Sequence, residues 1–278
     1  MKNLMIPALA LFLSAAAQAD DSPLWMRYCA ISPDGQTIAF SYQGDIYTVP
    51  SSGGKARQLT THPAHDTRPV WSPDGQRIAF AANRSGNFDV FLMNKEGGEP
   101  KRLTTHSTNE YPTTFKDNGH ILYLANVLQD AKDIQFPGTR FMQVYEISTD
   151  GGRPDLYSSL YMENIALSKD GSKLLYNDYK GYEDPWRKHH QSSITRDIWL
   201  CTLGKDRSFQ KVTTFGGEDR NPVWAADGAS FYYLSEEKGS FNIFKKDLAG
   251  NSEKQITTHT THPDRKSTRL NSSHSEIS

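Results

Sequence analysis

The chain has 278 residues, of which 36% are hydrophobic and 23% are charged, and its formal net charge at pH 7 is −1. This is an ordinary globular composition, and an aromatic share of 11% suits a β-rich fold. The balanced charge provides no basic field for nucleic acid, and no stretch approaches the run of about 20 apolar residues that a membrane span needs.

Residues 1–19 follow the order of a secretory signal peptide. Lys2 precedes an apolar run from Leu4 to Leu13, and the small-residue site Ala17-Gln18-Ala19 comes next. We therefore predict cleavage after Ala19 and a periplasmic or secreted protein, with a buried N-terminal helix as the alternative. Export permits disulfides, but Cys29 and Cys201 fall in separate repeats, so both thiols are expected to be free.

A short motif recurs along nearly the whole chain. Its clearest copy is Ser72-Pro73-Asp74-Gly75, which precedes the apolar run 77–81. Proline at the second position and glycine at the fourth suit a type I turn followed by a left-handed residue, that is, a tight hairpin. We expect the acids and glycines of these turns to be structural rather than catalytic. They are Asp34, Gly35, Asp74, Gly75, Asp170, Gly171, Asp227 and Gly228.

Each repeat contains four short runs of β-forming residues. In the second repeat they are 68–71, 77–81, 88–93 and 100–104, and the glycine pair 97–98 supplies positive φ angles for the hairpin between the last two. The aspartates of successive turns are 40, 43, 53 and 57 residues apart. Four strands in about 40 residues form the blade of a β-propeller.

We therefore predict an all-β fold, a β-propeller built of four-stranded blades, with five blades and the truncated start of a sixth. The blades lie near residues 25–62, 66–106, 109–157, 161–215 and 218–259. Within each blade the second strand is continuously apolar, which fits a strand covered on both faces. The aromatic residue of the third strand is expected to pack against its neighbours.

The wider spacings come from two insertions between second and third strands, at 125–140 and 177–195. Because blade strands are antiparallel, these loops emerge on the same face as the charged connections from each blade to the next. Arg68, Tyr111 and Arg220 in those connections are candidates for contacts at the mouth of the central channel. Solvated rim charge is the alternative, because surface loops are usually polar.

The histidines do not predict a metal site. His62, His106 and His259 each end a Leu/Ile-Thr-Thr-His segment, and each belongs to a different repeat. A shared metal would require them within a few ångströms of one another. The pair His189-His190 lies in an insertion and is expected to be a solvated or packed loop. No cofactor is indicated.

Residues 264–278 have no strand pattern, and their codons can be written as a common sequencing-library adapter. We therefore expect an artefact tail on a fragment whose natural sequence continues past Pro263, with a natural polar tail as the alternative. A propeller without its last blade exposes apolar faces that stacking would bury, so we expect aggregation or partial order.

Three features together resemble the N-terminal propeller of bacterial tricorn protease homologues. They are Pro23-Leu24-Trp25-Met26-Arg27, the repeated Ser-Pro-Asp-Gly units, and the segment from Lys180 to His190 that leads into Thr195-Arg196-Asp197-Ile198-Trp199. The resemblance covers roughly Asp20 to Pro263. The repeat alone is shared with TolB-like proteins and with the propellers of prolyl oligopeptidase relatives, whereas the segment after Lys180 makes the resemblance specific.

The resemblance implies a large, oligomeric serine peptidase in which this propeller precedes a second propeller, a PDZ-like domain and a catalytic core. The catalytic residues of that family lie in the C-terminal half, so none is assigned here, and the chain alone is expected to lack peptidase activity. The first propeller of the family is thought to restrict and position peptides through basic side chains. Arg187 and Lys188 are therefore candidate anchors for a peptide carboxylate.

Two other functions remain open on the sequence. A TolB-like propeller would bind a protein partner without any attached enzyme, and a prolyl oligopeptidase relative would continue into an α/β-hydrolase domain with a Gly-x-Ser-x-Gly motif. The gene beyond codon 263 distinguishes them, because each reading requires a different continuation. In every case the expected partners are peptides or proteins rather than nucleic acid.

Overall fold

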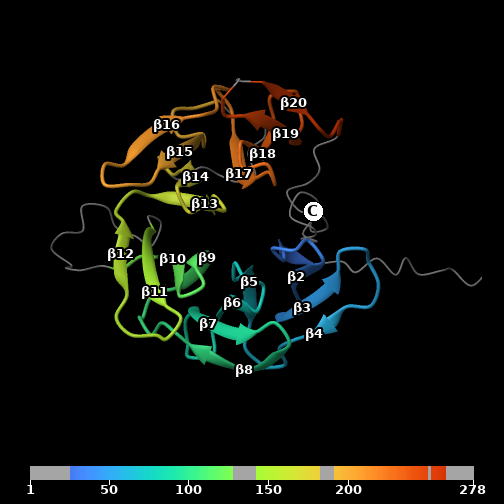
Figure 1. Ribbon diagram of the computed structural model, residues 1–278, viewed down its shortest axis with the longest axis vertical. Coiled ribbons are helices and arrows are strands. Elements are labelled where there is room, and N and C mark those ends of the chain that lie inside the picture. Colours follow the sequence, from blue (N-terminus) through green and yellow to red (C-terminus); the bar gives the residue numbers. More distant parts are fainter. Residues whose placement is uncertain (1–25, 128–141, 182–190, 250–251, 261–278) are drawn as a thin grey trace, which may run out of the picture.

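Five antiparallel sheets of four strands each make up the computed structural model, which describes residues 26–127, 142–181, 191–249 and 252–260. Figure 1 shows the sheets arranged in chain order around a common centre, like the blades of a propeller. The described residues contain no helix, and so none that could span a membrane. The prediction of an all-β propeller with four-stranded blades is confirmed.

Each blade is a meander in which every strand pairs with the next one in the chain. The innermost strands of blades one to five are β1 (Arg27–Ile31), β5 (Asp66–Trp71), β9 (Glu110–Asp117), β13 (Met162–Leu167) and β17 (Asp219–Trp224). The second strands are β2 (Thr37–Tyr42), β6 (Arg77–Ala82), β10 (His120–Ala125), β14 (Lys173–Asp178) and β18 (Ser230–Ser235). The third strands are β3 (Asp45–Pro50), β7 (Asp89–Asn94), β11 (Gln143–Ser148), β15 (Ile198–Thr202) and β19 (Asn242–Asp247). The outermost strands are β4 (Arg57–Gln58), β8 (Gly97–Arg102), β12 (Asp155–Ser158), β16 (Ser208–Lys211) and β20 (Glu253–Gln255).

A serine and an aspartate close the hairpin between the first two strands of a blade. In blade two, the Ser72 hydroxyl donates to Asp74 at 2.6 Å and accepts the amide of Arg77 at 2.9 Å, while Asp74 accepts the amide of Gln76 at 2.9 Å. Gly75 has a φ of +67°. The same bonds surround Asp34 and Asp170.

Blade three departs from this turn. Asp117 pairs directly with His120, so only Asn118 and Gly119 connect the strands, and Gly119 does not have a positive φ. This shorter turn explains why the sequence copy at 116–119 lacks the serine and the proline of the motif.

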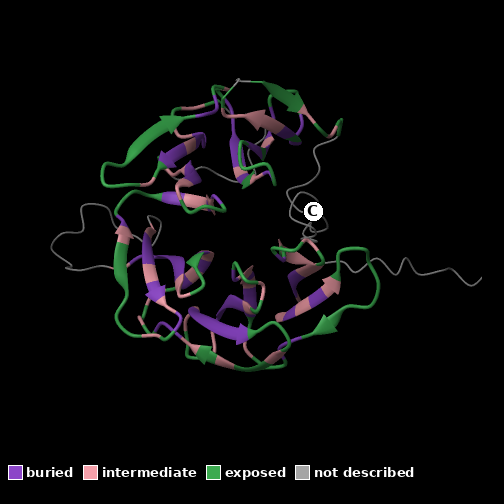
Figure 2. Cartoon of the chain, in the orientation of Figure 1, coloured by how far each residue is buried: buried purple, intermediate pink, exposed green. Residues whose placement is uncertain are grey.

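The hydrophobic core lies between the blades rather than within any one of them. Val90 and Leu103 of blade two, for example, pack against Ile121, Tyr123 and Tyr145 of blade three. Four such layers join the five described blades. Figure 2 shows the result, with buried second and third strands and exposed outermost strands. In blades two, three and four the second strands are therefore covered on both faces, as their continuous apolar runs predict.

An aromatic pair crosses from the second strand to the third in every blade. The paired residues are Phe40 with Tyr47, Phe80 with Phe91, Tyr123 with Tyr145, Tyr176 with Trp199, and Tyr233 with Phe244. The ring centroids of Phe80 and Phe91 are 5.9 Å apart, and those of Tyr123 and Tyr145 are 5.7 Å apart. Such cross-strand pairs contribute about 0.5–1.5 kcal/mol beyond the area they bury.

Tryptophans connect neighbouring blades near the centre. The indole of Trp71 in blade two donates to the carbonyl of Ala30 in blade one at 3.1 Å, and Trp224 in blade five donates to Ala166 in blade four at 2.9 Å. Each bond ties the end of one innermost strand to the innermost strand before it. These bonds hold β5 against β1 and β17 against β13.

Threonine hydroxyls replace the backbone ladder where the outermost strands end. In blade two the Thr104 hydroxyl accepts the amide of Val90 at 2.9 Å. Equivalent bonds run from Ile46 to Thr60, from Ile198 to Thr213 and from Ile243 to Thr257. The strand predicted at 100–104 accordingly runs from Gly97 to Arg102, because the side chain of Thr104 takes the place of a backbone acceptor.

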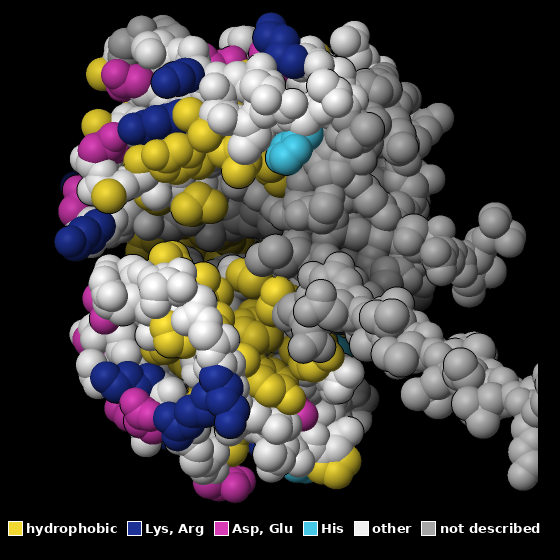
Figure 3. Space-filling view, turned by 90° about the vertical axis from the view of Figure 1, so that its right-hand side faces the viewer, with side chains coloured by type: hydrophobic (Ala, Val, Ile, Leu, Met, Phe, Trp, Pro, Cys, Tyr) yellow, Lys and Arg dark blue, Asp and Glu magenta, His cyan; other side chains and the backbone are white. Residues whose placement is uncertain are grey.

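The outer face of blade five is not covered by another described blade. Ile243 and Ile256 are 38% and 46% exposed, whereas their counterparts Val90 and Leu103 in blade two are 0% and 4% exposed. Figure 1 shows blades five and one as the two ends of the described arc, and Figure 3 shows hydrophobic side chains on the described surface at that side.

Both cysteines are free, as predicted. Cys29 is exposed and Cys201 is buried.

Candidate functional site

The innermost strands share an unusual backbone feature. All five described ones have a β-bulge or register shift in their pairing with the second strand, and at four of these a residue other than glycine has a positive φ. These residues are Tyr28, Arg68, Asn164 and Asn221, with φ values of 53°, 54°, 49° and 55°. In blade three the pairing puts Pro112 at this position, and proline cannot adopt a positive φ. Strained residues of this kind gather at functional sites.

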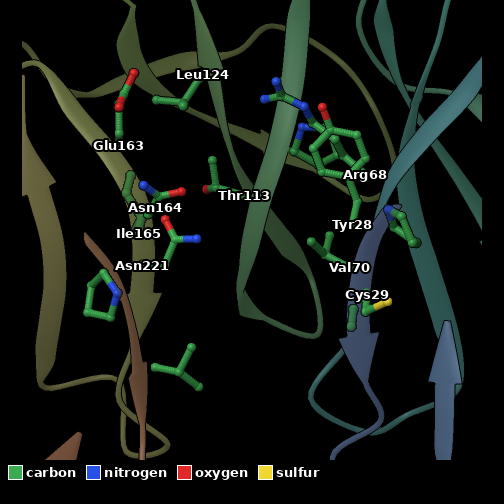
Figure 4. Close-up of a pocket in the computed structure, with 15 residues that line it drawn as sticks. Tyr28, Cys29, Arg68, Val70, Thr113, Leu124, Glu163, Asn164, Ile165 and Asn221 are labelled. Atoms are coloured by element: carbon green, nitrogen blue, oxygen red, sulfur yellow. The ribbon is translucent and has the colours of Figure 1, made fainter. Parts of the chain in front are cut away.

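A cavity of about 510 Å³ lies between the innermost strands, and all five of them contribute to its wall. The four bulge residues line it, together with Pro112. Of the described residues in the wall, only Arg68 and Glu163 carry a charge. Figure 4 shows Arg68 beside Tyr28 on one wall, and Glu163 with Asn164 and Asn221 on the opposite wall. The remaining wall is largely apolar or amide in character.

Arg68 is held between two aromatic rings. Its guanidinium carbon lies 4.1 Å from the ring centroid of Tyr111 and 5.2 Å from that of Tyr28. Phe88 packs against Tyr111 with ring centroids 5.4 Å apart, so the ring of Tyr111 is itself supported. Desolvation raises the pKa of the Tyr111 phenol above its usual value, which keeps that ring neutral. No carboxylate of the described residues pairs with Arg68, so its charge is available to a ligand.

The opposite wall rests on a network of charged side chains. Arg196 donates to Glu163 at 2.9 Å and to Glu218 at 3.1 Å, and Glu218 also pairs with Arg220 at 3.4 Å. Desolvation alone would lower the pKa of Arg196, but the two carboxylates raise it above its usual value. Glu163 keeps 37% of its side chain exposed. The network therefore fixes one oxygen of Glu163 and leaves its face toward the channel accessible.

A buried asparagine holds two of the bulges. The side-chain oxygen of Asn177 accepts the amide of Asn221 at 2.9 Å and the side-chain nitrogen of Asn164 at 3.2 Å. Its own nitrogen donates to the carbonyls of Asp219 at 2.8 Å and Asp197 at 3.2 Å. Asn177 is fully buried, so this one side chain fixes the polar wall of blades four and five.

The structure brings two of the predicted site residues together and separates the third from them. Arg68 and Tyr111 are in contact at the channel. Arg220 is 5% exposed, pairs with Glu218, and lies 3.9 Å from the ring centroid of Phe241. It stands one residue before the bulge position, and successive strand residues point in different directions. Arg187 and Lys188 lie outside the described residues.

Several channel residues were not predicted from the sequence, namely Tyr28, Glu163, Asn164 and Asn221. One signal was available, since Arg68 and Asn221 both precede a proline in an innermost strand. The predicted turn residues from Asp34 to Gly228 lie at the hairpins between first and second strands. Among the residues the structure describes, no group of three or more histidine, cysteine or acidic side chains could hold a metal ion.

Comparison with known proteins identifies the architecture. A tricorn protease homolog from Saccharolobus solfataricus is 22% identical over 247 residues, which are 86% of this chain and 21% of that protein. The chain thus spans about a fifth of this curated relative. Among solved structures, the tricorn protease superposes with a TM-score of 0.67 at 20% identity, over 86% of this chain and 23% of that one. TolB from Acinetobacter baumannii gives a TM-score of 0.63 at 16% identity, over 86% and 56% of the two chains.

These structural likenesses show a shared propeller fold. The family described as the tricorn protease N-terminal beta propeller domain matches residues 23–277, which is nearly the whole chain. The five-bladed arc, its four-stranded meanders and this match together show that the chain belongs to the tricorn N-terminal propeller family.

Proposed function

We propose that this chain is the propeller of a periplasmic serine peptidase that degrades peptides, and that its central channel restricts and positions those peptides. The observation that carries the proposal is Arg68, an uncompensated cation between Tyr28 and Tyr111 in the wall of the channel. A guanidinium recognises a carboxylate through paired hydrogen bonds, and partial exclusion of water strengthens that attraction. The ligand group suited to this site is the carboxylate at a peptide C-terminus.

The same proposal covers the partners and the location. Peptides would enter the channel, and further domains of the same polypeptide would carry out hydrolysis in a homo-oligomeric enzyme that needs no cofactor. Tyr111 would support Arg68 from the side, and Arg220 would act indirectly by holding Glu218. Arg187 and Lys188 would supply a second carboxylate contact. The signal peptide proposed at 1–19 would direct export to the periplasm.

Substitution of Arg68 tests the role of the channel. Arg68→Asn removes the cation and introduces the residue that blades four and five carry at the same left-handed position, so the bulge is retained. We expect trialanine with a free carboxylate to bind roughly tenfold more weakly to this variant, because a hydrogen-bonded charge pair is lost. Isothermal titration calorimetry measures the change. Trialanine amide is the control ligand, and its affinity should be the same for both proteins.

An unchanged affinity of Arg68→Asn for free trialanine would remove the support for peptide positioning at this channel. The second candidate function is then favoured, in which the propeller is a TolB-like module that binds a protein. The likeness to TolB supports this alternative. Genomic DNA read past codon 263 separates the two, because the first requires further domains with a peptidase core and the second requires none.

A further inference from the structure

The channel presents one charge of each sign on opposite walls. Arg68 of blade two and Glu163 of blade four are the two charged residues among the described lining of a cavity of about 510 Å³. Figure 4 shows them on facing sides, with the side chain of Thr113 between them. A ligand that spans the cavity therefore meets a cation at one end and a carboxylate at the other.

The carboxylate wall is built to accept a cation. Arg196 engages Oε2 of Glu163, and Oε1 makes no hydrogen bond within the described part of the chain. Arg196 also pairs with Glu218, which pairs with Arg220, so the cluster holds two cations and two carboxylates and its open acceptor is Oε1 of Glu163. An ammonium group at Oε1 of Glu163 would complete the remaining acceptor capacity of that carboxylate.

The residues that line the cavity beside Arg68 and Glu163 are uncharged. The lining near Glu163 consists of Asn164, Ile165 and Asn221, and the lining near Arg68 consists of Tyr28, Pro69 and Val70. These side chains suit the uncharged backbone and small side chains of a peptide. The size of the cavity falls within the range of about 300–1,000 Å³ that is usual for small-ligand sites.

We propose that the channel binds short peptides as zwitterions, with the terminal carboxylate at Arg68 and the terminal ammonium at Glu163. The inference rests on the proposed function and adds to it a second recognition point, which selects for a free amino terminus.

Cys29 provides a reporter for occupancy. It lines the same cavity and is exposed, whereas Cys201 is buried, so alkylation with iodoacetamide labels the channel selectively. Because desolvation raises the pKa of the Cys29 thiol, labelling is carried out above neutral pH. Three probes are compared for protection of Cys29 in the complete chain: trialanine, N-acetyl-trialanine and trialanine amide.

Trialanine is expected to protect Cys29 at roughly tenfold lower concentration than either capped peptide, since each cap removes one charged contact. Glu163→Gln keeps the shape of the side chain and an acceptor for Arg196. In this variant, free and acetylated trialanine should protect Cys29 at the same concentration, while the amide should still require a higher one. In Arg68→Asn, free trialanine and the amide should protect at the same concentration, and only N-acetyl-trialanine should require a higher one.

The outcomes separate the two proposals. If acetylation weakens protection as much in Glu163→Gln as in the parent, the ammonium does not bind at Glu163 and this inference is wrong. The positioning role still stands in that case, provided that Arg68→Asn removes the difference between free trialanine and its amide. If Arg68→Asn leaves the amide penalty unchanged, the positioning role fails. Protection by none of the three peptides would overturn both.

A measurement without any substitution guards against a variant that fails to fold. The α-amino group has a pKa of about 8, so a rise in pH beyond that value removes its charge. Calorimetry on the unmodified chain should then show weaker binding of trialanine at high pH and no such change for N-acetyl-trialanine. A parallel pH response of both peptides would contradict recognition of the ammonium.

Discussion

Carboxylates in this propeller are held in two opposite ways. Asp170 accepts hydrogen bonds from Ser168 and Ser172 at its turn, and these bonds lower its pKa to about 2. Glu110 at the start of β9 is 1% exposed, and desolvation raises its pKa to about 7. The Asp89 carboxylate adds to this rise, while hydrogen bonding from Thr104 and from the His106 backbone opposes it.

Glu110 should make the protein less stable as pH rises from about 4.5 to 7. Its pKa is higher in the folded state than the ordinary value of 4.5, so across this window the folded chain holds more protons than the unfolded chain. Glu110→Gln mimics the protonated form and should remove this loss. We expect the variant to be more stable than the parent at pH 8 by on the order of 2 kcal/mol, measured by urea unfolding.

Asp170→Asn is the control of opposite sign. The pKa of Asp170 is lowered, so its contribution is present above the unfolded value and is lost as pH falls toward 2. This variant should therefore lose stability at neutral pH and converge with the parent in acid. If the stability of Glu110→Gln changed with pH in the same way as that of the parent, Glu110 would not be the group that takes up a proton on folding.

Threonine hydroxyls beyond the outermost strands accept hydrogen bonds from third-strand amides that have no backbone acceptor. Thr104→Val keeps the shape of the side chain but leaves the buried amide of Val90 without its acceptor. We expect a loss of about 1–3 kcal/mol in the free energy of unfolding, because an unsatisfied buried donor carries its full desolvation cost. Chemical denaturation monitored by tryptophan fluorescence measures the loss.

The adjacent Thr105 is exposed and makes none of the hydrogen bonds found among the described residues, so Thr105→Val is the matched control. It should leave stability within about 0.5 kcal/mol of the parent. Equal losses from both substitutions would show that the hydroxyl of Thr104 does not cap β7.

Strand positions could be predicted from the sequence because turn chemistry and apolar runs are local signals. Within blade two, the predicted second strand 77–81 and third strand 88–93 nearly coincide with β6 and β7. The bulges could not be predicted, because a bulge is a mismatch between two paired strands and appears in neither strand alone. Arg68 and Arg220 occupy similar places in the sequence, yet a one-residue difference relative to the bulge separates their surroundings.

The likeness to the family predicted the architecture, but it did not predict the chemistry of the channel. Glu163 sits in a strand of blade four that lacks both the serine-proline turn and a proline after the bulge, so no motif marks it. Its position beside the channel depends on Arg196, which lies 33 residues further along the chain, and on Glu218, which belongs to the next blade. Such long-range pairing is set by packing between blades rather than by local sequence.

The arc formed by the described blades has an apolar face where a further blade would stack. Ile243 and Ile256 on that face are more than a third exposed, while the equivalent residues between blades are buried. Contiguous patches of this kind promote self-association.

Replacement of both residues by threonine should therefore reduce association of the chain. Sedimentation velocity across a concentration series is expected to show a shift toward monomer for the double variant Ile243→Thr/Ile256→Thr. Stability should change little, because the side chains are not in the core. Val90→Thr is the contrasting control, and we expect it to cost about 1–3 kcal/mol by placing a hydroxyl in a buried layer. Unaltered association of the double variant would show that this face does not mediate self-association.

The left-handed bulges also bear on how such a protein can diverge. Tyr28, Arg68, Asn164 and Asn221 share one backbone conformation and face one cavity, but they belong to separate sheets. A change at one of them leaves the hydrogen-bond ladders of the other blades intact. Basic, aromatic and amide side chains can therefore replace one another at these positions one at a time, with the fold retained at each step. New ligand preferences can arise by drift at these four codons.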